Sequence, residues 1–356
     1  MKIGIAVGGS LADVARLAAR AEQADLESVW VAELDRSAFV QASTAIAATR
    51  TIGVGTGVAL AFPRSPTITA MTAWDLDELS GDRFMLGLGP QVKRVLEARF
   101  SVHVDKPAPQ MRDYVRALRV IWAANRGGDE ARGDETRGDE ARVGGAQPPT
   151  FEGEHYRIAM PTFHGPARPE RRDTPVLIAA VGPILSRVAG EVADGLIGHP
   201  LASPCYLREA VAPRVAEGLA AAGRALDACP ITAMPMVCLG ENVDEARRAA
   251  RLQIAFYATT PSYKPILALH GRAALPRDLR RALVTGDRAR MVELIDDELL
   301  DAIAIAGRPE EAADRLMAWQ GVADRVVLGV PWYGMSPERQ RDALEAALEL
   351  AGRVTA

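Results

Sequence analysis

Residues Thr51 to Gly89 read TIGVGTGVALAFPRSPTITAMTAWDLDELSGDRFMLGLG, and this stretch decides the fold class. It predicts a β-branched strand at Ile52–Ala59, a turn with two prolines, an amphipathic helix at Thr67–Ser80 and a second apolar strand at Phe84–Gly89. Strands without polar alternation are buried on both faces, as in a parallel sheet. The stretch therefore predicts one βαβ unit, with functional residues at the carboxyl ends of its strands.

Strands of this kind recur along the chain and alternate with helical patterns. Eight are expected, at Lys2–Val7, Ser28–Ala32, Ile52–Ala59, Phe84–Gly89, Pro175–Ala180, Leu196–Gly198, Ile231–Leu239 and Arg325–Val330. Alternation of strands and helices implies a parallel sheet with helices outside it, and eight such units close into a barrel. We expect an α/β fold, a (β/α)8 TIM barrel with insertions that forms a single domain over residues 1–356.

Three segments interrupt this alternation. Residues 127–145 contain the tandem repeat GDEAR, GDETR, GDEAR (Gly128 to Arg142), whose six acids and three arginines predict a solvated, disordered loop. Pro149 to Ile158 predicts a β-hairpin that opens the second half of the chain. Residues 261–286, from Pro261 to Gly286, form a long excursion late in the barrel. It is either a plain packing segment or, as the family resemblance of the motifs described below implies, a lid over the substrate pocket.

Charge and hydropathy exclude two classes of partner. The net charge is −4 and there is no block of Lys and Arg, so the chain lacks the electrostatic footprint of a nucleic-acid-binding protein. No apolar run reaches the ~18 to 20 residues that span a membrane. Met1 leads directly into the strand KIGIAV without a cleavable signal pattern. We expect a cytoplasmic protein with neither a nucleic acid nor a membrane as partner.

Metal and hydrolase chemistry are not indicated either. The three cysteines show no CxxC spacing, and the five histidines show no HExxH or other ligand spacing. No G-x-S-x-G motif is present, which argues against an α/β-hydrolase. His199 follows the sixth strand, where it either points into the barrel mouth or serves as a turn residue.

Several of these stretches also resemble a known family. They are the strand ending GTGV, the helix closing on LDELSGDRF, the strand ending LGLG, the N-terminal MKIGIAV and ESVWVAELD, and TPVLIAAVGPILSRVAGEVADGLIG from Thr174 to Gly198. Together they are similar to the bacterial luciferase-like superfamily of flavin and deazaflavin oxidoreductases. The resemblance covers most of residues 1–125 and 150–200. Within the superfamily, the chain most resembles the branch that uses coenzyme F-420, the 8-hydroxy-5-deazaflavin.

A phosphate site is expected after the fifth strand. This strand delivers Ala180, Val181 and Gly182, and Pro183 then begins a helix. Proline suits the first helical position, and a glycine before it lets a ligand approach the backbone. The free N–H groups and the dipole of a helix N-terminus favour a phosphate. The resemblance implies that this loop binds the phosphate of the cofactor; the alternative is an ordinary βα turn.

The resemblance also implies where the cofactor ring lies. Relatives often place a non-proline cis peptide, or a bulge, at the end of the third strand against the ring. The matching bond here is Gly57–Val58, next to Ala59. Gly89, at the end of the fourth strand, would let the ring approach. The GVGTGV sequence around this bond is not a dinucleotide fingerprint, because its spacing is G-x-G-x-G and no helix follows directly.

The segment after the second strand, where relatives carry their proton donor, departs from the family pattern. Many relatives keep an acidic residue and then a histidine after the second strand, and this chain has Glu33, Leu34 and Asp35 there. Leucine cannot take or give a proton as imidazole does. Glu33 or Asp35 is therefore the candidate catalytic residue, unless the group comes from elsewhere or the reaction needs none. The alternative for Glu33 is an ion-paired structural carboxylate near the barrel mouth.

The resemblance thus implies an oxidoreductase that transfers hydride between coenzyme F-420 and an unknown small organic substrate. One alternative is a monooxygenase that uses FMN and oxygen. Another is a barrel that binds a flavin or deazaflavin without catalysis, for which Leu34 is the best argument. Relatives commonly dimerise through helices near the second and third strands, so a homodimer is expected.

Overall fold

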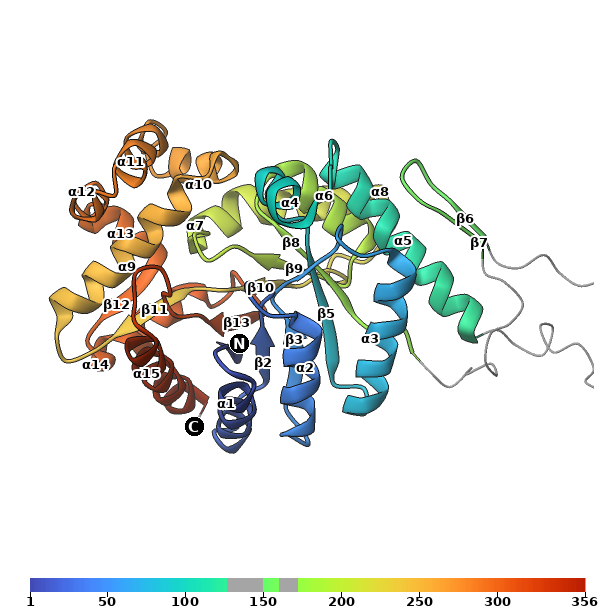
Figure 1. Cartoon of the computed structure of the whole chain (residues 1–356), viewed down its shortest axis with the longest axis horizontal. Helices are drawn as coiled ribbons and strands as arrows, with labels where there is room; N and C mark the ends of the chain where they lie inside the picture. Colours follow the sequence, from blue (N-terminus) through green and yellow to red (C-terminus); the bar gives the residue numbers. More distant parts are fainter. Residues whose placement is uncertain (127–149, 160–171, 356) are drawn as a thin grey trace, which may run out of the picture.

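The computed structural model describes residues 1–126, 150–159 and 172–355 (Figure 1). The expected acidic loop at 127–145 lies outside these residues. The expected hairpin is confirmed by two antiparallel strands, β6 (Thr150–Glu152) and β7 (Arg157–Ala159).

The described residues form a closed barrel of eight parallel strands, as predicted. Its strands are β1 (Lys2–Val7), β2 (Ser28–Val31), β3 (Gly53–Thr56), β5 (Phe84–Gly89), β8 (Val176–Ala180), β9 (Gly195–Gly198), β10 (Ile231–Ala233) and β13 (Arg325–Leu328). Around the barrel they follow the order β3, β2, β1, β13, β10, β9, β8, β5. The pairing of Val54 with Phe84 joins β3 to β5 and closes the ring.

Helices surround the barrel (Figure 1). Their bounds are α1 (Leu11–Gln23), α2 (Ala38–Ala47), α3 (Pro66–Ser80), α4 (Lys93–Phe100), α5 (Pro107–Arg126), α6 (Pro183–Val192), α7 (Pro204–Tyr206), the π-helical turn η3 (Leu207–Val211), α8 (Ala212–Ala221), α9 (Val243–Ala258), α14 (Pro309–Leu316), η5 (Met317–Trp319) and α15 (Pro337–Thr355). Local sequence explains several starts. Ser10 and Asp13 form a capping box at α1, and Ser65 caps α3 directly before Pro66.

Large side chains fill the barrel interior. Trp30, Leu177, Ile197 and Val327 from four strands, together with Met234 directly after β10, pack together there. The indole N–H of Trp30 donates to the hydroxyl of Ser28 at 2.8 Å, so its one polar atom is satisfied. A Cβ at Gly55 would lie 2.6 Å from the Trp30 ring, and the glycine therefore makes room for this side chain.

Two predicted strands are divided in the structure. The third ends at Thr56, and Ala59–Leu60 forms a separate short strand, β4, beyond the Gly57–Val58 bond. The seventh was predicted to run unbroken from Ile231 to Leu239, which is wrong. It breaks at Met234–Pro235, where proline offers no N–H to a ladder. Its second half, β11 (Met236–Leu239), pairs with β12 (Ala304–Gly307), a strand that the sequence did not predict.

The excursion at 261–286 is helical. It contains η4 (Pro261–Tyr263), α10 (Lys264–Leu269) and α11 (Leu275–Val284), and α12 (Arg288–Glu293) and α13 (Asp297–Ile303) follow it. These helices gather beside α9, at the upper left of Figure 1. We refer to α10 through α13 as the helical lobe. Whether it acts as a lid stays a prediction.

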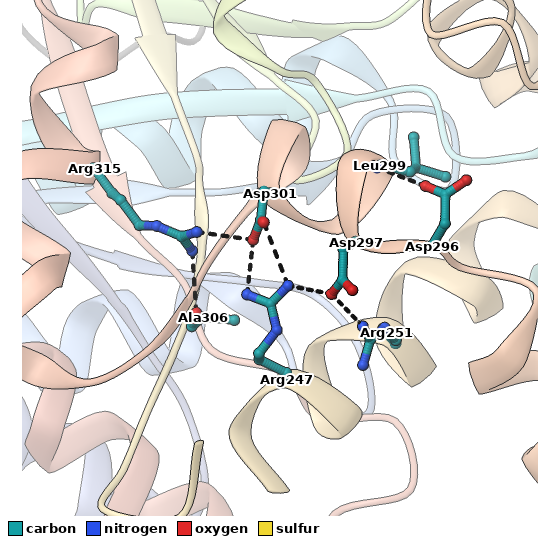
Figure 2. Close-up of polar contacts among 8 residues, drawn as sticks. All are labelled: Arg247, Arg251, Asp296, Asp297, Leu299, Asp301, Ala306 and Arg315. Atoms are coloured by element: carbon teal, nitrogen blue, oxygen red, sulfur yellow. Dashed lines mark hydrogen bonds and ion pairs between the residues drawn. The ribbon is translucent and has the colours of Figure 1, made fainter. Parts of the chain in front are cut away.

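An ion-pair network fastens the helical lobe to α9 (Figure 2). Arg247 contacts Asp297 and lies 2.8 Å from Asp301, and Arg251 lies 2.5 Å from Asp297. Arg315 of α14 joins the network at 2.9 Å from Asp301. Both aspartates lie on α13, so this helix is held by arginines from two other helices.

Other expectations can be compared with the described part of the chain. There, none of the helices is both long and apolar enough to cross a bilayer. The same residues contain no group of three or more His, Cys, Asp or Glu side chains arranged to hold a metal ion. Cys229 and Cys238 are buried free thiols, and Cys205 is a partly exposed one.

Candidate functional site

The structure brings the predicted cofactor residues together on one arc of the barrel mouth. β4 pairs with the end of β5, Leu60 standing opposite Gly89. β5 in turn pairs with β8, whose end carries Ala180. Gly57, Val58, Ala59 and Gly89 therefore lie beside the start of α6, as expected of the carboxyl ends of adjacent parallel strands. We refer to these residues and 180–183 as the cofactor arc.

The Gly57–Val58 peptide bond is cis, at the predicted position. Hydrogen bonds hold both of its residues to β2 and the residues after it. The Gly57 N–H donates to the Val31 carbonyl at 2.8 Å, and the Glu33 N–H donates to the Val58 carbonyl at 3.0 Å. A Cβ at Gly89 would lie 2.4 Å from the side chain of Val58, so Gly89 first of all makes room for Val58. A contact between Gly89 and a cofactor stays a prediction.

The start of α6 suits an anion. Gly182 is the N-cap residue, Pro183 is the first helical residue, and no side chain caps this end. A Cβ built on Gly182 would meet no atom within 4 Å, so the space before the helix is open. Tyr206 donates its hydroxyl to the Val181 carbonyl at 2.8 Å and holds the loop in place. Free N–H groups facing open space at a helix N-terminus fit a phosphate.

Both carboxylate oxygens of Glu33 accept hydrogen bonds from other residues. Its Oε2 accepts from the Leu60 N–H and from Arg64, each at 2.8 Å, and its Oε1 contacts Arg64 as well. The alternative of an ion-paired carboxylate thus describes its position. Asp35 and Leu34 are exposed, with 47% of Leu34 accessible. A catalytic role for Glu33 or Asp35 stays a prediction.

Aromatic side chains gather next to the cofactor arc, beginning at His199, which follows Gly198, the residue that pairs with Ala180. His199 lies after β9 between two rings, with centroids 4.1 Å from Tyr263 and 4.8 Å from Tyr257. The Trp332 indole N–H donates to the Tyr257 hydroxyl at 3.1 Å. We refer to His199, Tyr257, Tyr263 and Trp332 as the aromatic wall.

The imidazole of His199 is neutral. Its Nδ1 accepts from the Leu201 N–H at 3.1 Å, so the ring proton belongs on Nε2. Burial lowers the pKa of His199 to about 3, because the charged form would be desolvated. His199 therefore stabilises its own turn, as one of the two interpretations held. That its ring points into the barrel mouth stays a prediction.

The sequence matches one protein-family model over most of its length. The model of the luciferase-like monooxygenase family matches residues 3–325. The chain belongs to this family. The luciferase-like barrel predicted from the sequence motifs is thereby confirmed.

Relatives of this luciferase-like protein include well-covered matches. An uncharacterized protein of Mycobacterium tuberculosis is 37% identical over 336 residues, which cover 92% of each chain. The 5,10-methylenetetrahydromethanopterin reductase of Methanopyrus kandleri is 26% identical, covering 96% of this chain and 93% of that protein. A solved structure of a coenzyme F-420-dependent tetrahydromethanopterin reductase from that organism matches with a TM-score of 0.77 and 24% identity, over 99% of this chain and 97% of that one. The family and these relatives support oxidoreductase as the general reaction class.

Sequence reasoning missed several residues of this luciferase-like site. Arg64 stands between the two prolines of the loop after β4, which was a weak signal for a placed charge. Tyr257 lies on α9 and Trp332 follows β13, and no local pattern connects these distant parts of the chain. Only the tertiary structure brings Tyr257 against His199 and Trp332 against Tyr257.

Proposed function

We propose that this luciferase-like barrel is an oxidoreductase that transfers hydride between coenzyme F-420 and a small organic substrate. The observation that carries the proposal is the uncapped start of α6 at Gly182, where a Cβ would meet no atom within 4 Å. The relatives add support, because one of the solved structures with the same fold is that of an F-420-dependent reductase. The alternative is an FMN-dependent monooxygenase. The description of the matching family as luciferase-like monooxygenases supports this alternative.

In this proposal the residues of the chain bind and orient the cofactor. The first-turn N–H groups of α6 would hold the phosphate, and the Gly57–Val58 surface would support one face of the ring. Glu33 and Arg64 would act as positioning residues, because they hold Leu60 and Val58 in place. The bound deazaflavin would supply the hydride chemistry itself.

Proton exchange would use groups at the exposed side of the mouth. Leu34 offers none, and both oxygens of Glu33 are occupied by Arg64 and Leu60. Asp35 is the acidic residue of this segment that stays exposed. We therefore assign proton exchange to Asp35 or to solvent that reaches the mouth beside it.

We also propose that the protein forms a homodimer through α2 and α3. These helices pack against each other, and Val40, Ile68, Met71 and Leu79 expose 50 to 60% of their surface on them. Apolar surface gathered on two adjacent helices is typical of an interface between subunits. Light scattering should give twice the chain mass, and Met71→Glu should reduce it to one chain.

Titration of the purified protein with F-420 and, separately, with FMN tests the function. Saturable binding of F-420, with hydride transfer to a member of a substrate panel, is the expected result. Saturation by FMN alone would favour the monooxygenase, and binding of F-420 without turnover of any panel member would favour the non-catalytic barrel. A protein that binds neither compound would overturn the proposal.

A further inference from the structure

A groove runs between α11 on one side and the segment from η4 to the start of α10 on the other. Helices α10 and α11 are at the upper left of Figure 1. The groove has a volume of about 670 Å³, which is within the range of small-molecule sites. The described residues that line it belong neither to the cofactor arc nor to the aromatic wall.

One face of α11 supplies most of the charge in the groove. Arg277, Arg280 and Arg281 are three or four residues apart, so they share the helix face that lines the groove. Val284 continues this face one turn later and is 81% exposed. Arg280 is fixed by the hydrogen bond that it donates to the Thr259 carbonyl at 2.9 Å, and its other N–H groups stay available. Like charges four residues apart destabilise a helix, and an anion in the groove would relieve this repulsion.

The positive charge of the groove lacks a counter-charge. Its four cationic side chains include Lys264 at the start of α10, and the described lining contains no acidic residue. Lys264 and Arg281 are exposed and form no ion pair within the described part of the chain. Arg277 lies 3.5 Å from Asp278, its neighbour in the sequence, which does not line the groove. A concave surface lined by one sign of charge concentrates ions of the opposite sign.

Acidic side chains of the helical lobe are engaged on other faces. Asp296 and Glu298 lie 2.7 Å and 2.9 Å from Arg272. Asp297 and Asp301 meet the arginines of α9 (Figure 2). These four carboxylates are therefore occupied, and the charge of the groove is left for a ligand.

The rest of the lining is mostly small and apolar. It includes Pro261, Ala273, Ala274 and Pro276, whose short side chains leave the groove open. Apolar surface of this kind gains free energy when an apolar group covers it and displaces water. The groove thus combines charges for an anionic group with a surface for an apolar group.

We propose that this groove binds a small organic dianion that carries an apolar group, of which an aryl phosphate is the simplest example. The guanidinium groups of α11 match a phosphate because each offers two parallel N–H groups, and Lys264 adds a cation from the other side. The alanines and prolines contact the apolar group. This is a second binding site, additional to the one proposed for the cofactor, and it does not depend on the use of F-420.

Calorimetric titration of the full chain with three probes tests the proposal. The probes are 2-naphthyl phosphate, inorganic phosphate, which lacks the apolar group, and 2-naphthol, which lacks the charge. Naphthyl phosphate should bind at least about tenfold more tightly than either of the others. Its affinity should fall as salt is added, because mobile ions screen exposed charges. Equal affinities for naphthyl phosphate and either other probe, or an affinity that salt does not change, would overturn the proposal.

Charge-removing variants locate the probe site. The double variant Lys264→Gln/Arg281→Gln should weaken naphthyl phosphate binding at least about tenfold. The control Arg214→Gln/Arg290→Gln removes the same charge at exposed positions that do not line the groove, and should stay within about twofold of wild type. All four positions are exposed, so the variants should fold. Equal weakening in the two double variants would contradict the assignment.

F-420 titration of the groove variant separates this proposal from the function proposed above. The affinity for F-420 should stay within about twofold of wild type, because the cofactor arc is untouched. A tenfold loss would make the groove part of the cofactor site and overturn the proposal of a second site. Wild-type protein that binds naphthyl phosphate but no F-420 would remove only the proposed function.

Two further probes exclude larger partners. They are a hexaglutamate peptide, which represents an acidic protein segment, and vesicles of phosphatidylglycerol, which represent an anionic membrane. Both should bind more weakly than naphthyl phosphate, because the groove has the volume of a small-molecule site. Tighter binding of the peptide or the vesicles, lost in Lys264→Gln/Arg281→Gln, would assign the groove to that partner and overturn the proposal.

Discussion

Glu33 and Arg64 form a two-point ion pair at the carboxyl end of β2. Nη1 of Arg64 lies 2.8 Å from Oε2 of Glu33, and Nη2 contacts Oε1. The Glu33 side chain is only 8% exposed, and the same residue holds Leu60 and Val58 through hydrogen bonds. The pair therefore sets the shape of the surface that the proposed cofactor ring would contact.

Replacing Arg64 by Ala should destabilise this surface. The Glu33 carboxylate would stay largely buried without its partner, which should lower the free energy of unfolding by about 2 kcal/mol. F-420 binding should weaken as well. Urea unfolding and cofactor titration measure both effects. Arg214→Ala, which removes an exposed pair with Glu217, is the matched control and should cost under about 0.5 kcal/mol. Equal losses in both variants would contradict this role for Arg64.

Gly182→Asp and Gly182→Asn should separate anion binding from helix capping. Both side chains cap a helix well, and the open space at Gly182 accepts either one. Only the aspartate opposes a phosphate, so F-420 affinity should fall at least about tenfold more in Gly182→Asp than in Gly182→Asn. Fluorescence titration gives the dissociation constants. Equal affinities in the two variants would remove the phosphate from the start of α6.

Leu34→His should introduce a titrating group at the mouth. Because Leu34 is 47% exposed, the change should leave the free energy of unfolding within about 0.5 kcal/mol of wild type. The pH profile of hydride transfer should gain an inflection near about 6.5, the ordinary pKa of an exposed imidazole. Leu34→Gln controls for polarity and should add no inflection. Superimposable profiles for all three proteins would place residue 34 away from the reacting atoms.

Glu22 should make the fold sensitive to acid. Desolvation raises the pKa of this carboxyl, but hydrogen bonds to its Oε1 from the N–H groups of Thr51, Ile52 and Arg50 outweigh it and lower the pKa to about 2. A depressed pKa in the folded state contributes stability above the unfolded value of 4.5, and this stability is lost as the pH falls toward 2.

The matching variant is Glu22→Gln. At pH 7 it should cost about 1 kcal/mol, since charged acceptors bind N–H groups more strongly than neutral ones do. Denaturant unfolding from pH 7 to pH 3 should show the gap to wild type narrowing below about pH 4.5. A gap that stays constant with pH would show that the charge of Glu22 is not the stabilising element.

Arg247→Met should loosen the helical lobe from α9. The hydrogen bonds that Arg247 donates to Asp301 raise the pKa of Arg247. The Arg247 side chain is 18% exposed, so this pair is better shielded than a surface pair (Figure 2). The cost should be about 1 kcal/mol. Hydrogen exchange should quicken in α13. Arg290→Ala, on an exposed pair within α12, should leave exchange in α13 unchanged. Faster exchange in both variants, or in neither, would contradict the anchoring role.

Local pattern predicted most of the barrel, because each βα unit carries its own periodicity. It failed at the seventh strand, where Pro235 ends β10 and the chain pairs instead with residues 304–307. Four consecutive apolar residues at β12 indicate burial but not a strand, since nothing nearby says which partner they meet.

The sequence by itself determined the fold class and the turn at Gly182–Pro183, because strand and helix patterns and a Gly-Pro step are local features. The place of the Gly57–Val58 bond came from the resemblance of its motifs to a known family. Only the tertiary structure decided that Arg64 pairs with the carboxylate of Glu33. It also decided that His199, Tyr257, Tyr263 and Trp332 form one cluster. The physical reason is barrel closure. It brings the ends of distant strands to one rim, and side-chain pairing there depends on distances in space that no local periodicity encodes.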